Sequence, residues 1–432
     1  MLNRVSSGEK YFFMFMMVMW VARTTPLTSF KIGENPILTP VYLLILLYYY
    51  VRYCKLTNIP LYCLLSIYAS WYVCICLKYG GIQGVEFTFL YSFIIVHIAF
   101  NIYNKTEFLS IFENVIVKLC ILSLIVWAAA NILPGFPKIM HSIAVYENHP
   151  PTETNSIIVG MGSQISMGIR RNIGFTWEPG RFSCFIIMTM FFNLIRTKFQ
   201  LKGNINMLIL LVTLLSTIST TGYFALIAII LFYLINTTTN SKFLTTIIIS
   251  LFLPSFVGLS FMMDKVVGLS DIDTEISAIN YFGNRGMEVV CPQRIASLYF
   301  EYINLIHDFW FGFNNIENSY INNHLFKGVL VTSSQGVLII LSKYGILFGS
   351  FFYFCLFRST TFLSKVYHYK GKYMFAFVFI LISVSYEFWG NCIWMYFYLS
   401  VFYTSFSNKY YLLDLNLQRR LALLFNKRSI GN

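Results

Sequence analysis

The chain has 432 residues, of which 57% are hydrophobic and only 11% are charged, and its mean hydropathy is +0.65. Soluble domains carry about 25% charged residues, so this composition excludes a soluble enzyme, a disordered chain and a disulfide-stapled secreted module. The formal net charge of +13 does not indicate nucleic acid in such a chain, because cytoplasmic loops of membrane proteins collect Lys and Arg. We therefore expect an all-α polytopic membrane protein whose residues 1–432 form a single integral membrane domain in contact with lipids.

Twelve apolar runs approach the length of about 20 residues that a transmembrane helix needs. Several are shorter, so their ends must extend into flanking residues. Residues 219–222 (Ser-Thr-Thr-Gly) predict a tight turn between two of the runs, although one long broken helix is the alternative. The runs cover residues 11–22, 37–51, 59–77, 85–103, 114–133, 181–195, 205–219, 222–235, 243–262, 334–357, 373–387 and 390–406.

Twelve spans place both ends of the chain on the same side of the membrane. Of the 31 Lys and Arg residues, 18 lie in the segments that would share this side and 11 in the opposite segments, while Lys118 and Lys343 lie within spans. Because Lys and Arg accumulate in cytoplasmic segments, we predict that both termini are cytoplasmic.

Two outward-facing segments, residues 134–180 and 263–333, are too long to be mere connectors. Function in polytopic proteins concentrates in such loops and in the polar groups beneath them. Both loops are basic on the side where few positive charges are expected, which predicts that they bind an anion. The outward-facing cations in or beside them are Lys138, Arg170, Arg171, Arg181, Arg285, Arg294 and Lys327, with Lys265 as an eighth.

The first loop ends in a cluster of three arginines and one glutamate over residues 170–181. A Glu-Pro-Gly element breaks the chain before the next run, so Arg181 lies in a first helical turn, where a cation opposes the helix dipole and a nearby anion would relieve it. The planar fork of arginine binds phosphate or pyrophosphate in a bidentate manner. The alternative is that Arg170 and Arg171 contact lipid headgroups. In that case Glu178 pairs with Arg181.

Residues 294–310 of the second loop have the periodicity of an amphipathic helix. Such a helix would lie on the membrane surface or cap a cavity between spans, although its polar stripe is equally well explained as a solvated face. The polar stripe consists of Arg294, Ser297, Glu301, Asn304 and Asp308, and the apolar stripe of Leu298, Tyr302, Leu305, Ile306 and Phe309.

Two further polar features follow this helix. Amides near aromatic rings after Gly312, including Asn318, are typical of carbohydrate binding. Lys343 lies near the middle of the run 334–357, where an ammonium is costly and faces a cavity or a partner; a structural pairing with Glu387 or with a backbone carbonyl explains it equally well. No group of His, Cys, Asp or Glu residues has metal-ligand spacing, so neither a metal nor a cofactor is expected.

Three short motifs occur in a fixed order along the chain. Residues 171–180 read Arg-x-x-Gly-Phe-x-x-Glu-Pro-Gly, residues 216–223 read Ser-Thr-x-Ser-Thr-Thr-Gly-Tyr, and residues 343–349 read Lys-Tyr-Gly-Ile-Leu-Phe-Gly. With a long outer loop between the second and the third, this order resembles the bacterial O-antigen polymerase and O-antigen ligase superfamily over about residues 170–357. The motifs are short and degenerate, so their order and spacing carry the resemblance.

The resemblance implies a glycosyltransferase of the bacterial inner membrane that acts at the periplasmic face, without a metal, on polyprenyl-pyrophosphate-linked oligosaccharides. The arginines of the family's two outer loops map onto Arg170 or Arg171, Arg181 and Arg294. Many relatives, ligases especially, carry His-Asn where this chain has Ser-Gln at 334–335, which favours a polymerase over a ligase. A chain-length regulator stays open as a partner.

We therefore expect a polymerase of oligosaccharide repeat units for O-antigen, capsule or exopolysaccharide. Two other functions stay open: a ligase that transfers the glycan to lipid A core or protein, and a transporter that flips lipid-linked sugars. Glu178 is the expected general base for the acceptor hydroxyl, unless it only orients Arg181, and His324 is the second choice if its loop folds back. Arg294 completes the expected catalytic residues, and the expected substrate-binding residues are Arg170, Arg171, Arg181, Arg285, Asn318 and Lys343.

Overall fold

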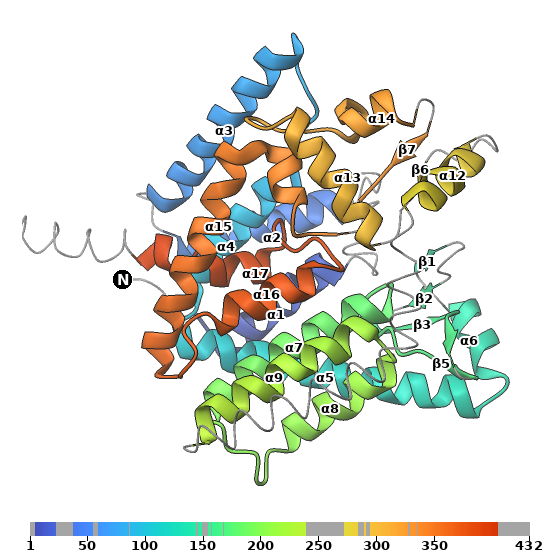
Figure 1. The fold of residues 1–432 in the computed structure, drawn as a ribbon. Helices are drawn as coiled ribbons and strands as arrows, with labels where there is room; N and C mark the ends of the chain where they lie inside the picture. The colour runs from blue at the N-terminus through green and yellow to red at the C-terminus, as the bar shows by residue number, and fades with distance from the viewer. Residues whose placement is uncertain are drawn as a thin grey trace, which may run out of the picture.

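Most of the apolar runs fold into helices in the computed structural model (Figure 1). It describes residues 5–22, 38–54, 59–85, 87–143, 146–148, 154–156, 158–166, 168–238, 272–283, 289–290, 294–326, 329–333 and 335–404. In chain order the helices are α1 (Ser7–Ala22), α2 (Leu38–Tyr53), α3 (Ile59–Tyr79), α4 (Phe87–Ile102), α5 (Lys105–Ile132), α6 (Phe136–Ile143), α7 (Pro179–Arg196), α8 (Ile205–Thr217), α9 (Thr220–Thr237), α12 (Ile272–Gly283), α13 (Arg294–His307), α14 (Tyr320–His324), α15 (Ile339–Tyr367), α16 (Met374–Ser383) and α17 (Cys392–Tyr398).

Four helices are long and apolar enough to cross a membrane, judged by length and composition. They are α3, residues Thr106–Ile132 of α5, α9 and α15. Shorter apolar helices accompany them at Phe89–Ile102, Ile205–Thr217 and Met374–Ser383. The expected class, a mainly helical membrane protein, is confirmed at this level.

The expected count of twelve spans is not reached within the described residues. The run 373–387 yields only the 10 residues of α16, and the run 390–406 yields the 7-residue helix α17, a turn at Leu399 and further helical residues at 400–404. The cause is the polar turn between them, where the side chain of Asn391 accepts a hydrogen bond from the backbone N–H of Ile393 (3.1 Å) and so caps α17. The run 243–262 lies outside the described residues.

Helix α7 is almost entirely buried. Every residue from Pro179 to Ile195 is buried, and α5, α8 and α9 pack along it (Figure 1). Pro179 supplies the first helical residue, where its missing N–H is not needed. The structure therefore confirms the predicted helix over residues 181–195 and extends it by one or two residues at each end.

Helices α8 and α9 are separate, as the Ser-Thr-Thr-Gly turn predicts. Ile218 adopts a left-handed conformation with φ 47° at the end of α8. The Ser219 hydroxyl then accepts a hydrogen bond from the backbone N–H of Gly222 (3.2 Å) and caps α9. The alternative of one long broken helix through this region is therefore wrong.

The two long connecting segments contain short strands as well as helices. Residues 134–180 hold the antiparallel sheet β1 (Tyr146–Asn148), β2 (Thr154–Ser156) and β3 (Gly160–Gly162), followed by the hairpin of β4 (Ile165–Ser166) and β5 (Ile169–Arg170). In the second segment β6 (Val289–Val290) pairs in parallel with β7 (Leu330–Val331). These strands depart from the all-α expectation, and they give both segments a defined shape.

Helix α15 is interrupted at Gly345 (φ 76°, ψ 166°), where residues 309–314 cross it. The backbone N–H of Asn314 donates to the carbonyl of Lys343 (2.9 Å), and that of Ile346 donates to the carbonyl of Phe309 (2.8 Å). A Cβ at Gly345 would overlap the backbone of the crossing segment. The crossing thus satisfies the backbone groups that the break frees, as an apolar environment requires.

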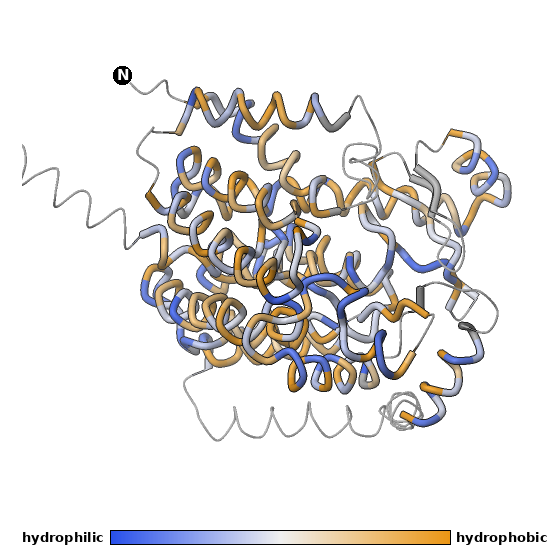
Figure 2. Tube along the Cα trace, turned by 90° about the horizontal axis from the view of Figure 1, so that it is seen from above, coloured by the Kyte–Doolittle hydropathy of each residue, from blue (hydrophilic) through white to orange (hydrophobic). Residues whose placement is uncertain are grey.

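Hydrophobic residues cover the outside of the molecule as well as its interior, as the hydropathy colouring of Figure 2 shows. Large apolar side chains are strongly exposed on several helices, among them Leu44 (63%), Ile125 (61%) and Phe354 (63%). Water would not tolerate so much apolar surface on a soluble monomer. This surface, together with the four long apolar helices, indicates a membrane-embedded protein.

Candidate functional site

Glu178, Arg294 and Tyr386 meet where α7 and α13 begin. A carboxylate oxygen of Glu178 lies 4.0 Å from a guanidinium nitrogen of Arg294, with 28% and 33% of the two side chains exposed. The Arg294 guanidinium lies over the Tyr386 ring, 5.0 Å from its centroid, and Glu178 is close enough to Tyr386 to act on it electrostatically. With Arg171, described below, these residues form what we call the arginine cluster.

The Glu-Pro-Gly element explains how Glu178 is aimed at this position. Glu178 has extended backbone angles (φ −145°, ψ 137°) and stands immediately before the first residue of α7. Gly180 lies against Tyr386, and a Cβ at position 180 would overlap the tyrosine hydroxyl. The close approach of Tyr386 therefore requires glycine at this position.

Arg171 reaches the same region from the β4–β5 hairpin. Its Nε donates to the carbonyl of Thr217 (3.0 Å), and one of its terminal nitrogens donates to the side chain of Gln164 (2.9 Å). Burial lowers the pKa of Arg171, and the nearby Tyr386 and Glu178 oppose that shift. Arg171 is thus held in place by neutral oxygens, within range of the charge of Glu178.

The turn between α8 and α9 borders the same site. The backbone N–H of Asn172 donates to the carbonyl of Ser216 (3.0 Å). On the other side of the turn, the hydroxyls of Thr221 and Ser385 lie 2.6 Å apart, next to Tyr386. The structure therefore brings two motifs of the sequence, residues 171–180 and 216–223, into contact around the arginine cluster.

Arg170 and Arg181 have other surroundings. Trp127 donates to the Arg170 carbonyl (2.6 Å), and the Arg170 guanidinium lies 3.4 Å from the carbonyl of Gly162. Arg181 is 6% exposed. Its guanidinium lies 4.3 Å from the Trp177 ring and donates to the carbonyl of Val21 (3.1 Å), so it joins α7 to α1.

The polar stripe of α13 faces the protein, so its interpretation as a solvated face is wrong. Ser297, Glu301 and Asn304 are at most 3% exposed. Glu301 accepts a hydrogen bond from the hydroxyl of Ser342 in α15, and Asn304 accepts one from the backbone N–H of Ile321 (3.2 Å). The helix therefore covers the polar start of α15.

Glu301 is a carboxyl group that sequence reasoning placed in the polar stripe without assigning it a role. Burial, together with the charge of Glu387, raises the pKa of Glu301 to about 7, against the lowering effect of hydrogen bonds from Ser342 and other neighbours. Its protonation state therefore changes near neutral pH. Periodicity alone does not report this, because it does not say which stripe is buried.

The remaining predicted site residues lie in the second segment and, in the case of Lys343, in α15. Asn318 donates to the Gln83 side chain (3.1 Å). Lys343 is half-buried, with its ammonium 5.5 Å from the Tyr344 ring centroid. Arg285 lies outside the described residues.

His324 is separated from Arg294 along α13. It is exposed, and its ring contacts Tyr320, which stacks on His307 at the last residue of α13. Arg294 opens the same helix, about 20 Å along its axis. The segment therefore does not bring His324 into the contacts that define the arginine cluster.

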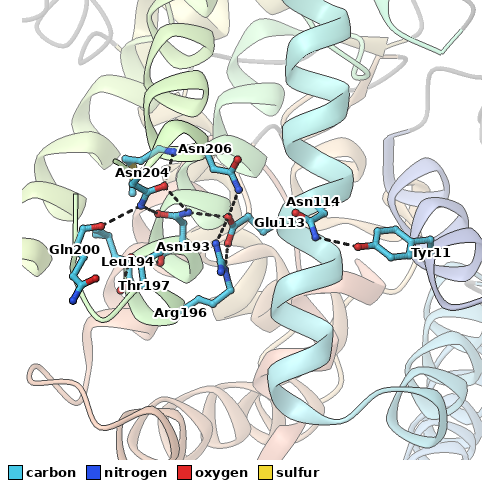
Figure 3. Close-up of polar contacts among 11 residues, drawn as sticks. Tyr11, Glu113, Asn114, Asn193, Leu194, Arg196, Thr197, Gln200, Asn204 and Asn206 are labelled. Atoms are coloured by element: carbon cyan, nitrogen blue, oxygen red, sulfur yellow. Dashed lines mark hydrogen bonds and ion pairs between the residues drawn. The ribbon is translucent and has the colours of Figure 1, made fainter. Parts of the chain in front are cut away.

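A second polar group, which the sequence did not indicate, lies around Glu113 at the other end of α7 (Figure 3). Glu113 is 1% exposed and forms a two-pronged ion pair with Arg196 (2.7 and 2.8 Å). Asn193 and Asn206 also donate to it (2.8 and 2.7 Å). These contacts join α5, α7 and α8 through one carboxylate.

Among the described residues, no group of three or more His, Cys, Asp or Glu side chains is arranged to hold a metal ion. Comparison of the chain with family models, with curated proteins and with solved structures gives no match. A functional hypothesis for this chain therefore depends on the geometry of the arginine cluster and on the sequence motifs around it.

Replacing the buried carboxylate of the second group should destabilise the protein. In Glu113→Gln the charge opposite Arg196 is lost inside the bundle. We expect the free energy of unfolding to fall by about 2–3 kcal/mol, which is small for a broken buried pair because Arg196 can rehydrate. Glu107→Gln on the same helix is the matched control, since its pair with Lys10 is more exposed and is worth less than about 1 kcal/mol. Thermal unfolding in detergent measures both, and equal shifts would contradict the central role of Glu113.

The raised pKa of Glu301 predicts a pH-dependent stability. The folded state favours the protonated carboxyl more than the unfolded state does, so the free energy of unfolding should fall as pH rises from 4.5 towards about 7. The shift in the pKa of Glu301 corresponds to a change of roughly 3 kcal/mol in the free energy of unfolding. Glu301→Gln should remove this loss, whereas Glu317→Gln, at an exposed position, should keep it. Melting curves between about pH 5 and pH 8 test this; a pH-independent wild type would refute it.

Proposed function

We propose that the chain is a glycosyltransferase that polymerises polyprenyl-pyrophosphate-linked oligosaccharide repeat units of O-antigen, capsule or exopolysaccharide. The observation that supports this most is the ion pair of Arg294 with Glu178 beside Tyr386, with Arg171 of the other connecting segment within range of the charge of Glu178. Two guanidinium groups next to one carboxylate supply what a glycosyl transfer from pyrophosphate requires.

Arginines suit the leaving group because they bind two phosphate oxygens at once and keep their charge at all relevant pH values. Arg171 and Arg294 would hold the pyrophosphate and stabilise the negative charge that grows on it as the glycosidic bond breaks. We select Arg171 over Arg170 because the Arg170 guanidinium lies near Gly162 instead.

The reaction needs one base and no redox step. A hydroxyl of the incoming unit attacks the anomeric carbon of the growing glycan, the bond from that carbon to the pyrophosphate oxygen breaks, and polyprenyl pyrophosphate leaves. Glu178 would take the hydroxyl proton. Its distance of 4.0 Å to Arg294 means that a bound pyrophosphate can draw Arg294 away and leave the carboxylate available as a base.

In this proposal the chain is embedded in a bacterial inner membrane, with both termini in the cytoplasm. Residues 134–180 and 263–333 then lie on the periplasmic side. The contact between Glu178 of the first segment and Arg294 of the second supports this assignment, because both segments must emerge on one side of the membrane to meet.

Removing either arginine of the cluster should abolish long glycan chains. We expect Arg171→Ala and Arg294→Ala to lower the polymerisation rate by about 10²–10³-fold while the protein remains in the membrane. Arg170→Ala is the matched control and should give nearly normal chains. Gel ladders of glycan length from complemented deletion strains measure this; normal ladders from both Arg171 and Arg294 variants would make the pyrophosphate assignment wrong.

The base is tested separately. Glu178→Gln keeps the shape of the side chain but cannot accept the proton, so the rate with purified protein and lipid-linked repeat units should fall by about 10²–10⁴-fold. Substrate binding should change little. A nearly normal rate would show that Glu178 only positions Arg294.

The same assays separate the alternatives. A deletion strain that accumulates single-repeat products supports a polymerase, whereas unattached long polymer indicates a ligase. Polymer made by purified protein from lipid-linked substrate already exposed on the outer face excludes a pure flippase.

A further inference from the structure

Helix α13 has the opposite polarity to an amphipathic helix on the surface of a soluble protein. Its buried side carries Ser297, Glu301 and Asn304 together with Ala296 and Phe300. Its outer side is mainly apolar and aromatic, with His307 as an exposed polar residue in the last turn. The outward side chains are Leu298 (42% exposed), Tyr299 (41%), Tyr302 (52%) and Ile306 (54%), and the turn that follows adds Phe309 (42%) and Trp310 (61%).

The end of α13 is fixed to the end of a helix that is long enough to span a membrane. Lys78, in the last turn of α3, forms an ion pair with Asp308 and donates to the carbonyl of Gly312 (2.8 Å). About two turns earlier in α3, Trp71 donates to the carbonyl of Phe311 (2.9 Å). Residues 308–312 are therefore held beside the last two to three turns of α3.

Helix α3 itself exposes apolar side chains at this level. Val73 is 55% exposed and Leu77 is 77% exposed, in a helix that qualifies as a candidate span. The C-terminal end of the apolar outer side of α13 thus lies beside the end of α3, which also exposes apolar side chains. Tyr and Trp are the residues that proteins place at the boundary between hydrocarbon and headgroups.

We propose that α13 lies in the membrane interface, with its apolar outer side inserted among phospholipid acyl chains and its polar side against the protein. The occupant of this face is lipid, because the exposed surface is continuous with that of a candidate span and its polar groups already have protein partners. Arg294, at the first residue of the helix, is then held at the level of the lipid headgroups. This placement holds whether or not the chain polymerises glycans.

The test compares water accessibility at matched positions of the same connecting segment. Tyr302→Cys and Ile306→Cys place a thiol on the outer side of α13, and Ser277→Cys places one on an exposed polar position of α12. The full-length protein is reconstituted in phosphatidylcholine–phosphatidylglycerol vesicles and treated on both sides with a charged maleimide. Peptide-level mass spectrometry then reads each cysteine separately from the native ones.

We expect the thiols at 302 and 306 to react at least about tenfold more slowly than the thiol at 277. Equal rates would place the outer side of α13 in water and overturn the proposal. Wild-type protein in vesicles that contain a phospholipid with a photoreactive acyl chain provides the second measurement, which does not depend on the folding of any variant. Lipid adducts on residues 298–310 support the proposal; adducts on α3 without any on residues 298–310 overturn it, because a protein surface or water then covers that face.

Discussion

Pairing of charges inside an apolar bundle is the interaction on which the position of α7 depends. Its long middle section is apolar and buried, so charge is confined to its ends. At one end Arg196 pairs with Glu113 of α5, and at the other Glu178 pairs with Arg294 of α13. Because an unpaired charge in such surroundings is costly, the buried carboxylate of Glu113 fixes its end of the helix, whereas the longer and more exposed pair of Glu178 and Arg294 contributes less.

The same constraint links the arginine cluster to the membrane. Helix α13 carries Arg294 at its first residue, Glu301 two turns later against α15, and an apolar outer side. Any lateral shift of α13 would move Arg294 relative to Glu178. In the proposed arrangement, contact of α13 with lipid, protonation of Glu301 and the geometry of the pyrophosphate site would therefore be coupled through one short helix.

Residue types and their spacing were enough to find the segments of the candidate site. They did not show which of two adjacent arginines, Arg170 or Arg171, belongs to it. The pattern around 170–181 indicated an anion site. In the structure Arg171 lies within range of the charge of Glu178, whereas the Arg170 guanidinium lies near the carbonyl of Gly162. Adjacent residues at a strand end face different ways, and only the docking of the hairpin on the end of α8 determines which arginine faces the cluster. The carboxylate Glu113 escaped notice because its partners lie in α7 and α8, far along the chain.

The sequence by itself determined that the chain is helical and apolar, where α7 starts and ends, and that α13 has two stripes, because composition and periodicity are local properties. Only the tertiary structure decided that the polar stripe of α13 is the buried one, that several apolar runs break into short helices, and that Glu178 meets Arg294. Those outcomes depend on partners distant in sequence. In water the apolar stripe of a helix faces the protein core, whereas in lipid it can face outward. The same pattern of two stripes therefore fits either orientation until the neighbouring elements are known.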